Sequence, residues 1–147
     1  MTELLSPLAG TLGALKDVSD PVFASEMLGG GVAIDPTMST QQVVSPIAGK
    51  LLKVHPHAFV VHDGTVGVLV HLGIDTVKLA GDGFTVLAAE KSTVEAGQAV
   101  VEWDPSVAVA HQMDPVVLIC QMDTAPGPIT PEAGRQVVAG EVLFAAV

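Results

Sequence analysis

Basic side chains are scarce in this chain, and their scarcity narrows the partners it can have. There are 6 Lys and Arg residues against 16 Asp and Glu residues, which leaves a formal net charge of −10. Binding to a nucleic-acid backbone depends on basic side chains that release counterions, and an anionic membrane surface repels an acidic chain. The charge balance therefore argues against both and favours a protein partner with a basic face.

Cysteine is scarce as well, and long apolar runs are absent from the sequence. The single cysteine excludes an intrachain disulfide and fits a reducing compartment. No uncharged apolar run approaches the roughly 18 residues that a membrane helix needs. The first residues have neither the basic nor the apolar region of a signal peptide. We expect a soluble, cytoplasmic protein, with residues 1–147 forming one domain.

Valine, glycine and proline are abundant, with 24, 15 and 10 copies. Valine favours strands, whereas glycine and proline break helices and make turns. The composition therefore predicts an all-β, antiparallel β-sandwich or barrel with at most short helices. The best helix candidate starts after Asp104-Pro105 and runs to about Gln112. Strands are predicted at Leu51–Val54, Ala58–His62, Val66–His71, Thr76–Leu79, Val100–Trp103, Val116–Cys120 and Val142–Phe144.

Two short sequences occur twice. Ser6-Pro-Leu-Ala-Gly10 returns as Ser45-Pro-Ile-Ala-Gly49, and Val94-Glu-Ala-Gly97 returns loosely as Val137-Val-Ala-Gly140. The two offsets differ and each sequence has only two copies, so the chain is not a solenoid. A sandwich or barrel with matching turns in two pseudo-duplicated halves explains the repeats. Common turn chemistry is the other explanation.

The strongest chemical signal is a group of histidines. Four of the five, His55, His57, His62 and His71, fall within 17 residues, and the fifth is His111. The segment from His57 to His71 predicts a β-hairpin that turns at Asp63-Gly64. We expect His62 at the hairpin tip and His111 in the helix to be solvated.

The register of this hairpin decides whether His57 and His71 share a face. A two-residue turn pairs residues whose numbers add to 127 and sets the two on opposite faces. A three-residue loop gives a total of 126 or 128 and puts both on one face. Direct opposition would bring their Cβ atoms to about 5 Å. The residues alone leave this choice open, and they also leave open a nucleophile with a hydrogen-bonding neighbour, the start of a zinc site, or two histidines that satisfy each other.

The residues after His71 carry a family resemblance. The run VLVHLGIDTVKLAGDGF resembles the signature of the glucose-type IIA component of the bacterial sugar phosphotransferase system. Successive blocks resemble the same family: SDPVFASEMLGGGVAIDP (19–36), VVSPIAGKLLKV (43–54), HAFVV (57–61) and VEAGQAVVEWD (94–104). The resemblance extends from about Ser6 to the C-terminus. It implies a phosphocarrier that accepts a phosphoryl group from the small protein HPr and passes it to a cysteine of a sugar-specific IIB domain.

The resemblance also implies roles for individual residues. His71 resembles the phosphorylated nucleophile, modified at Nε2, and His57 resembles the second histidine, which hydrogen-bonds the phosphoryl group. Asp20 and Asp75 resemble the acidic pair that meets basic residues of the partners. Val22 and Phe23 would help to form the surrounding apolar depression. The resemblance implies no cofactor and no required metal, although His57 and His71 are a pair that could hold an incidental zinc ion.

One block departs from the family pattern. Better-known members have Thr two residues before the second histidine, in a longer loop, whereas this chain has His55-Pro56 in a shorter one. We expect His55 to be exposed rather than to replace that threonine. The resemblance selects the even-numbered register, with His57 and His71 on one face. Cys120 is expected to be a small core residue.

Two other classes of function compete with this interpretation. Biotinyl and lipoyl carrier domains are small β-sandwiches that need a lysine at an exposed hairpin tip, often between methionines, and no lysine here has Met beside it. A zinc hydrolase of similar fold would use His55-x-His57 as ligands together with an upstream histidine. His55 is the first histidine of the chain, so that ligand is missing.

Overall fold

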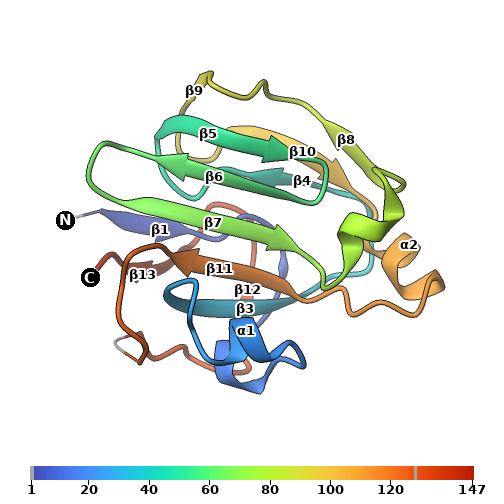
Figure 1. The fold of residues 1–147 in the computed structure, drawn as a ribbon, viewed down its shortest axis with the longest axis horizontal. Helices are drawn as coiled ribbons and strands as arrows, with labels where there is room; N and C mark the ends of the chain where they lie inside the picture. The colour runs from blue at the N-terminus through green and yellow to red at the C-terminus, as the bar shows by residue number, and fades with distance from the viewer. Residues whose placement is uncertain (1, 128) are drawn as a thin grey trace.

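Strands make up most of the ordered elements in the computed structural model, which describes residues 2–127 and 129–147 (Figure 1). Every pairing between them is antiparallel, and the helical elements have six residues or fewer, so the predicted all-β class is confirmed. The strands are β1 (Glu3–Leu5), β2 (Gly10–Ala14), β3 (Gly30–Pro36), β4 (Gln41–Val44), β5 (Gly49–His55), β6 (Ala58–His62), β7 (Gly67–Leu72), β8 (Phe84–Val86), β9 (Thr93–Val94), β10 (Ala99–Trp103), β11 (Val117–Gln121), β12 (Gln136–Val137) and β13 (Val142–Ala145). The helical elements are η1 (Leu15–Asp17), α1 (Pro21–Ala24), η2 (Thr76–Leu79) and α2 (Pro105–Ala110).

The strands form one large sheet and two small ones. The large sheet has eight strands in the order β12-β2-β3-β11-β7-β6-β5-β9, and the small sheets are β4-β10-β8 and β1-β13. Figure 1 shows the large sheet across the front, with α1 below it, α2 at one side and the terminal strands next to each other. The main core contains residues of all three sheets, among them Leu4, Val43, Phe59, Val70 and Trp103, each fully buried.

The repeated sequences form the centre of a pseudo-twofold arrangement. Ser6 and Ser45 are both fully buried, and each Oγ donates a hydrogen bond of 2.7 Å to the carbonyl two residues later. The two loops also bond to each other, through Leu5 N to Pro46 O at 2.9 Å and Val44 N to Pro7 O at 2.8 Å. These matched contacts show that the repeats are equivalent parts of two halves.

The second pair of repeats completes the symmetry. β12 pairs with β2 through Val137 and Gly10, and β9 pairs with β5 through Val94 and Gly49. Gly140 N donates to Ser6 O at 2.9 Å, and Gly97 N donates to Ser45 O at 2.8 Å. The predicted pseudo-duplication is therefore confirmed, because each turn of one half has its counterpart in the other.

The hairpin of β6 and β7 has a register that differs from the even-numbered one expected. His62 pairs with Gly67 and Ala58 with His71, so paired residues have numbers that add to 129. The loop has four residues because the Asp63 carboxylate accepts hydrogen bonds from Thr65 N and Val66 N, at 2.8 and 2.7 Å. A side chain that caps its own turn can hold a longer loop than the Asp-Gly pair suggests.

Two further predictions concern local elements. The segment Thr76–Leu79 is the 3-10 helix η2, not a strand, because it follows a left-handed turn at Asp75 (φ 65°). The helix expected after Asp104 is confirmed as α2. Asp104 caps it by accepting from Ser106 N at 3.0 Å, and Pro105 occupies its first position.

Candidate functional site

The two histidines singled out by the sequence lie against each other. Their ring centroids are 5.2 Å apart and their planes are 74° apart, an edge-to-face contact. His71 belongs to β7, whereas His57 is the second residue of the two-residue turn that joins β5 to β6. Since a turn residue is free of the alternation of a strand, the register of 129 does not keep the rings apart.

The Nδ1 atom of His71 has a backbone partner. It lies 2.7 Å from the carbonyl oxygen of Gly73, which can only accept a hydrogen bond. In the neutral ring, the proton is therefore on Nδ1 and the lone pair on Nε2. The sequence analysis did not identify the Gly73 carbonyl as part of the site. The signal that could have found it is the two-residue spacing of His71 and Gly73 in the HxGID run.

The loop after His71 is held from two directions. The buried Thr76 hydroxyl donates to the Leu72 carbonyl at 2.6 Å. Gly73 N donates to Val116 O, and Ile74 N donates to Asp114 O, both at 2.9 Å. These bonds fix the backbone on both sides of the Gly73 carbonyl, and with it the orientation of the His71 ring.

The short helix α1 brings a second group of predicted residues to the site. Asp20 caps the helix, with its carboxylate accepting from Val22 N at 2.9 Å and Phe23 N at 3.4 Å. The ring of Phe23 packs on His71 with centroids 5.1 Å apart. Val22 is 44% exposed beside it. A cap with Pro at the first position explains why four residues form a helix here.

The surroundings of both histidines favour neutral rings. Burial lowers the pKa of His71, and the Gly73 carbonyl, Asp20 and Asp75 act in the opposite direction without outweighing it. The pKa of His57 is lowered to about 4, first by burial, then by positive charge on His71 and on His55. At neutral pH both rings therefore have one N–H donor and one free lone pair.

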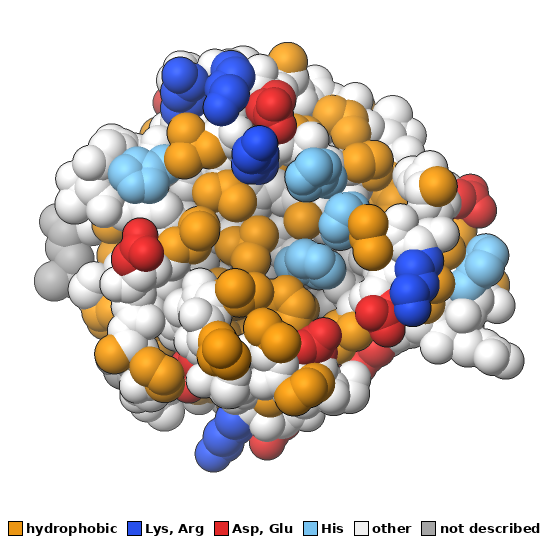
Figure 2. Space-filling view, viewed as in Figure 1, with side chains coloured by type: hydrophobic (Ala, Val, Ile, Leu, Met, Phe, Trp, Pro, Cys, Tyr) orange, Lys and Arg blue, Asp and Glu red, His pale blue; other side chains and the backbone are white. Residues whose placement is uncertain are grey.

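Of the three remaining histidines, one lies next to the pair and two lie away from it. His55 is exposed, as expected, yet its ring stacks on His57 with centroids 5.7 Å apart and planes 22° apart. His62 lies at the far end of β6, and His111 caps the C-terminus of α2 and is exposed. Figure 2 shows a group of histidine side chains on one face of the molecule, with hydrophobic side chains around them.

The apolar surroundings come from the sheet itself. Residues paired across antiparallel strands point to the same face. Ala58 and His71 are such a pair, and so are Val60 and Leu69, which lie two residues further along the same two strands. Val60 and Leu69 are only partly buried. The histidines therefore lie in an open, apolar part of the sheet.

The pseudo-twofold shows which residue of the other half is the counterpart of His71. Leu12 and Leu51 each lie two residues after a repeated glycine, and they pair with Ile34 and Val61. Ile34 pairs in turn with Val117, and Val61 pairs with Val68, so Val117 and Val68 are equivalent. His71 lies three residues after Val68. Cys120 lies three residues after Val117, so it is the counterpart of His71. Cys120 is 1% exposed in a cluster with Leu15, and burial raises the pKa of its thiol to about 12. The expectation of a core cysteine is confirmed.

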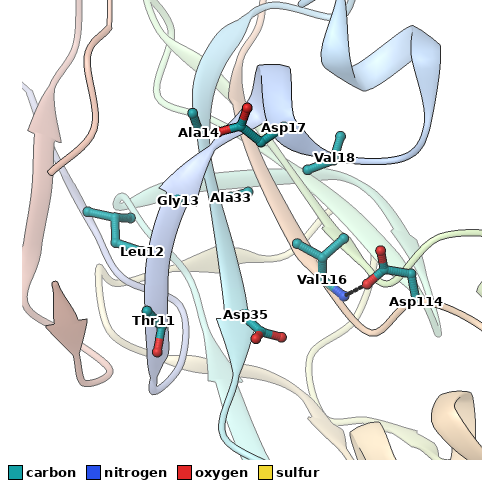
Figure 3. Close-up of a pocket in the computed structure, with 10 residues that line it drawn as sticks. All are labelled: Thr11, Leu12, Gly13, Ala14, Asp17, Val18, Ala33, Asp35, Asp114 and Val116. Carbon is teal, nitrogen blue, oxygen red and sulfur yellow. Dashed lines mark hydrogen bonds between the residues drawn. The ribbon is translucent and has the colours of Figure 1, made fainter. Parts of the chain in front are cut away.

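A hollow of about 350 Å³, open to solvent, lies elsewhere on the same face, between β2, β3 and the segment before β11 (Figure 3). Its lining includes Ala33, whose pairing partner Leu118 is also the partner of His71. Exposed carboxylates of Asp17 and Asp35 stand at the hollow. None of the histidines lines it, so this hollow is separate from the candidate site around His71.

Comparison with known proteins places the chain in a family. Residues 2–126 match the model of the phosphoenolpyruvate-dependent sugar phosphotransferase system, EIIA 1. The chain belongs to this family. It is 41% identical over 104 residues to the PTS system glucose-specific EIIA component of Halalkalibacterium halodurans, which covers 69% of this chain and 59% of that protein. It is 40% identical over 146 residues to the PTS system N-acetylglucosamine-specific EIICBA component of Escherichia coli, which covers 96% of this chain and 22% of that one.

A solved structure agrees with the family assignment. The chain resembles the glucose permease IIA from Mycoplasma capricolum with a TM-score of 0.81 and 34% identity, over 97% of this chain and 94% of that one. The chain spans less than two thirds of the length of the curated relatives named above. Among the residues that the structure describes, no helix is long and apolar enough to cross a membrane. The described residues also contain no group of three or more His, Cys, Asp and Glu side chains arranged to hold a metal ion.

Proposed function

We propose that this chain is a phosphocarrier of the sugar phosphotransferase system. In this proposal, Nε2 of His71 accepts a phosphoryl group from HPr and passes it to the cysteine of a IIB domain. The observation that carries the proposal is the hydrogen bond from Nδ1 of His71 to the Gly73 carbonyl, because it leaves the lone pair on Nε2. Family membership supports the reaction class, and it disfavours a zinc hydrolase or a biotinyl or lipoyl carrier.

The transfer needs no proton to leave His71. The Nε2 lone pair attacks phosphorus, the new N–P bond forms, and the bond from phosphorus to the donor breaks. The ring then has one positive charge, with its proton still on Nδ1 and bonded to the Gly73 carbonyl. The negative carboxylates of Asp20 and Asp75 favour that charge. Phosphoryl transfer has a loose transition state, so holding the ring in place is most of what the protein must do.

His57 is assigned the stabilisation of the phosphoryl group. With a pKa of about 4 it is neutral, and it can donate one N–H to a phosphoryl oxygen beside His71. A neutral donor holds the group less tightly than a second positive charge would. This suits a carrier that must give the group away, since very tight binding of an intermediate slows the next step.

The rim of the site is assigned to partner binding. Asp20 and Asp75 place negative charge near His71, where Val22 is exposed and the buried ring of Phe23 packs on His71. Basic residues of HPr and of the IIB domain would meet these carboxylates during brief encounters, for which electrostatic attraction raises the association rate. Asp75 is exposed at a left-handed turn, where aspartate is tolerated.

The setting of the reaction follows from the same proposal. We treat residues 1–147 as a single EIIA domain that works in the cytoplasm and reaches the membrane only through a permease. A glucose-type or N-acetylglucosamine-type IIB domain is the proposed acceptor, because relatives with both names align with this chain. Transfer from the labelled chain to a panel of IIB domains would identify the sugar system.

The central test is labelling by phospho-HPr. We expect an acid-labile phosphoryl group on His71 and no labelling of His71→Ala. His111→Ala is the control, because His111 is exposed at the end of α2 and outside the site. Normal labelling of His71→Ala would overturn the assignment.

A second variant separates the roles of the two histidines. His57→Gln keeps a side chain that can donate a hydrogen bond but lacks the imidazole ring. We expect it to accept from phospho-HPr and to donate poorly to the IIB domain. Equal loss of both steps would contradict the separate role assigned to His57.

A further inference from the structure

The third histidine of the cluster has no role in the scheme above. His55 is the last residue of β5 and pairs with Ala58 across the tight turn made by Pro56 and His57. Its ring is exposed but not free, because it stacks nearly parallel on His57 at 5.7 Å. Proline restricts the residue before it to extended backbone, which limits the conformations open to His55.

We propose that His55 is a positioning residue for His57, and that its stacked ring holds His57 in the edge-to-face contact with His71. The inference rests on the proposed phosphocarrier function. His57 is a turn residue with no hydrogen bond to its ring in the structure described here, so ring packing is what fixes its orientation. The two contacts that do this are the stack on His55 and the edge contact with His71.

The charges around the pair are consistent with this arrangement. Positive charge on His55 and on His71 contributes to the low pKa of His57, after burial. Next to His55 in the chain, Val54 N donates a hydrogen bond to the Glu90 carboxylate at 3.0 Å. That bond is the first cause of the lowered pKa of Glu90, and positive charge on Lys53, Lys91 and His55 adds to it.

These groups act on the two rings in opposite ways. The Glu90 carboxylate attracts positive charge on His55, while that charge opposes a proton on the stacking partner of His55, His57. Asp20 and Asp75 act on His71 rather than on His57. His55 therefore supports a neutral His57 as well as an oriented one, and the two effects can be separated by substitution.

Two variants separate the ring from its charge. His55→Phe keeps a flat ring that can stack and removes the charge, whereas His55→Ala removes both. We measure nuclear Overhauser contacts between the rings of His57 and His71, the pH titration of the His57 ring, and the rate of donation to a IIB domain. The control is His111→Ala, which lies outside the site.

The expected results differ for each readout. The contact between His57 and His71 should persist in His55→Phe and disappear in His55→Ala. The pKa of His57 should rise in both variants, because both lose the charge. Donation should slow on the order of tenfold in His55→Ala, since a misplacement of about 1 Å can cost up to about a hundredfold in rate, and should stay near the parent rate in His55→Phe.

The proposal is overturned if His55→Ala keeps the ring contact, or if His55→Phe loses it to the same extent. The ring measurements need no phosphoryl donor. If the parent chain neither accepts nor donates a phosphoryl group, the proposed function fails, and the ring contacts still decide whether His55 positions His57.

Discussion

The Nδ1 atom of His71 lies 2.7 Å from the carbonyl oxygen of Gly73. The bond spans only two residues, so it depends on how the chain turns between them. Gly73 has a φ of +81°, and a Cβ there would lie 2.5 Å from the Cγ2 atom of Thr76. A residue without a side chain is therefore required at this position if the carbonyl is to face the ring.

This requirement predicts the effect of Gly73→Ala. The substitution should lower the free energy of unfolding by about 1–3 kcal/mol, because the strained backbone must shift. It should also slow labelling of His71 by phospho-HPr. Gly13→Ala is the matched control, since Gly13 has no positive φ and nothing lies within 4 Å of its Cβ position. Urea denaturation and labelling rates give the answer, and equal behaviour of the two variants would contradict the prediction.

The two functions of Asp20 can be separated in the same way. Asp20→Ala removes the cap of α1 and should cost about 1 kcal/mol of stability. Asp20→Asn keeps an acceptor for Val22 N and Phe23 N and should cost only a few tenths. Both variants lose the charge, so both should accept phosphoryl groups from HPr more slowly and with weaker dependence on salt. An unchanged salt dependence in Asp20→Asn would refute the electrostatic role.

Stability should depend on pH through His57. Its pKa is about 4 in the folded chain against an ordinary value of 6.5. Between these two pH values, the unfolded chain therefore binds a proton that the folded chain does not. The associated stability is fully present above pH 6.5 and is lost as the pH falls toward 4. The lowered pKa of His71 acts in the same direction. In denaturant titrations at pH 7.5 and about pH 5, the parent should lose stability between the two pH values and His57→Gln should lose less; an equal loss in the two proteins would contradict the prediction.

The pseudo-twofold predicts a pair of equal effects. Ser6→Ala and Ser45→Ala each remove a buried hydrogen bond of 2.7 Å and leave a carbonyl without its partner. Each should cost about 1–2 kcal/mol, with a difference below about 0.5 kcal/mol. Denaturation midpoints with an unchanged slope would measure this. A large difference between the two would show that the halves are equivalent in geometry but not in energy.

Local patterns were enough for much of the fold. Asp104-Pro105 predicts α2 correctly because a cap and a first-turn proline act over three residues. β6 was predicted with its bounds because its apolar run is short and lies between turn residues. β3 was missed, since it starts with Gly30-Gly31 and ends at Pro36, residues that are unfavourable in isolated strands. Glycine is needed at position 31 because a Cβ atom there would clash with the Ile119 carbonyl of β11. Only the assembled sheet brings that carbonyl close.

The sequence by itself indicated the proposed chemistry of this protein and determined its all-β class and its repeated turns, because these depend on residue types and on spacings of a few positions. Only the tertiary structure decided the register of the hairpin and the contacts of His57. Asp63 holds a four-residue loop, and His57 sits in a turn, where side-chain direction does not alternate. The tertiary structure also decided which half has the site. Cys120 lies in a buried cluster that includes Leu15 and Phe23, from η1 and α1, while its counterpart His71 is only partly buried.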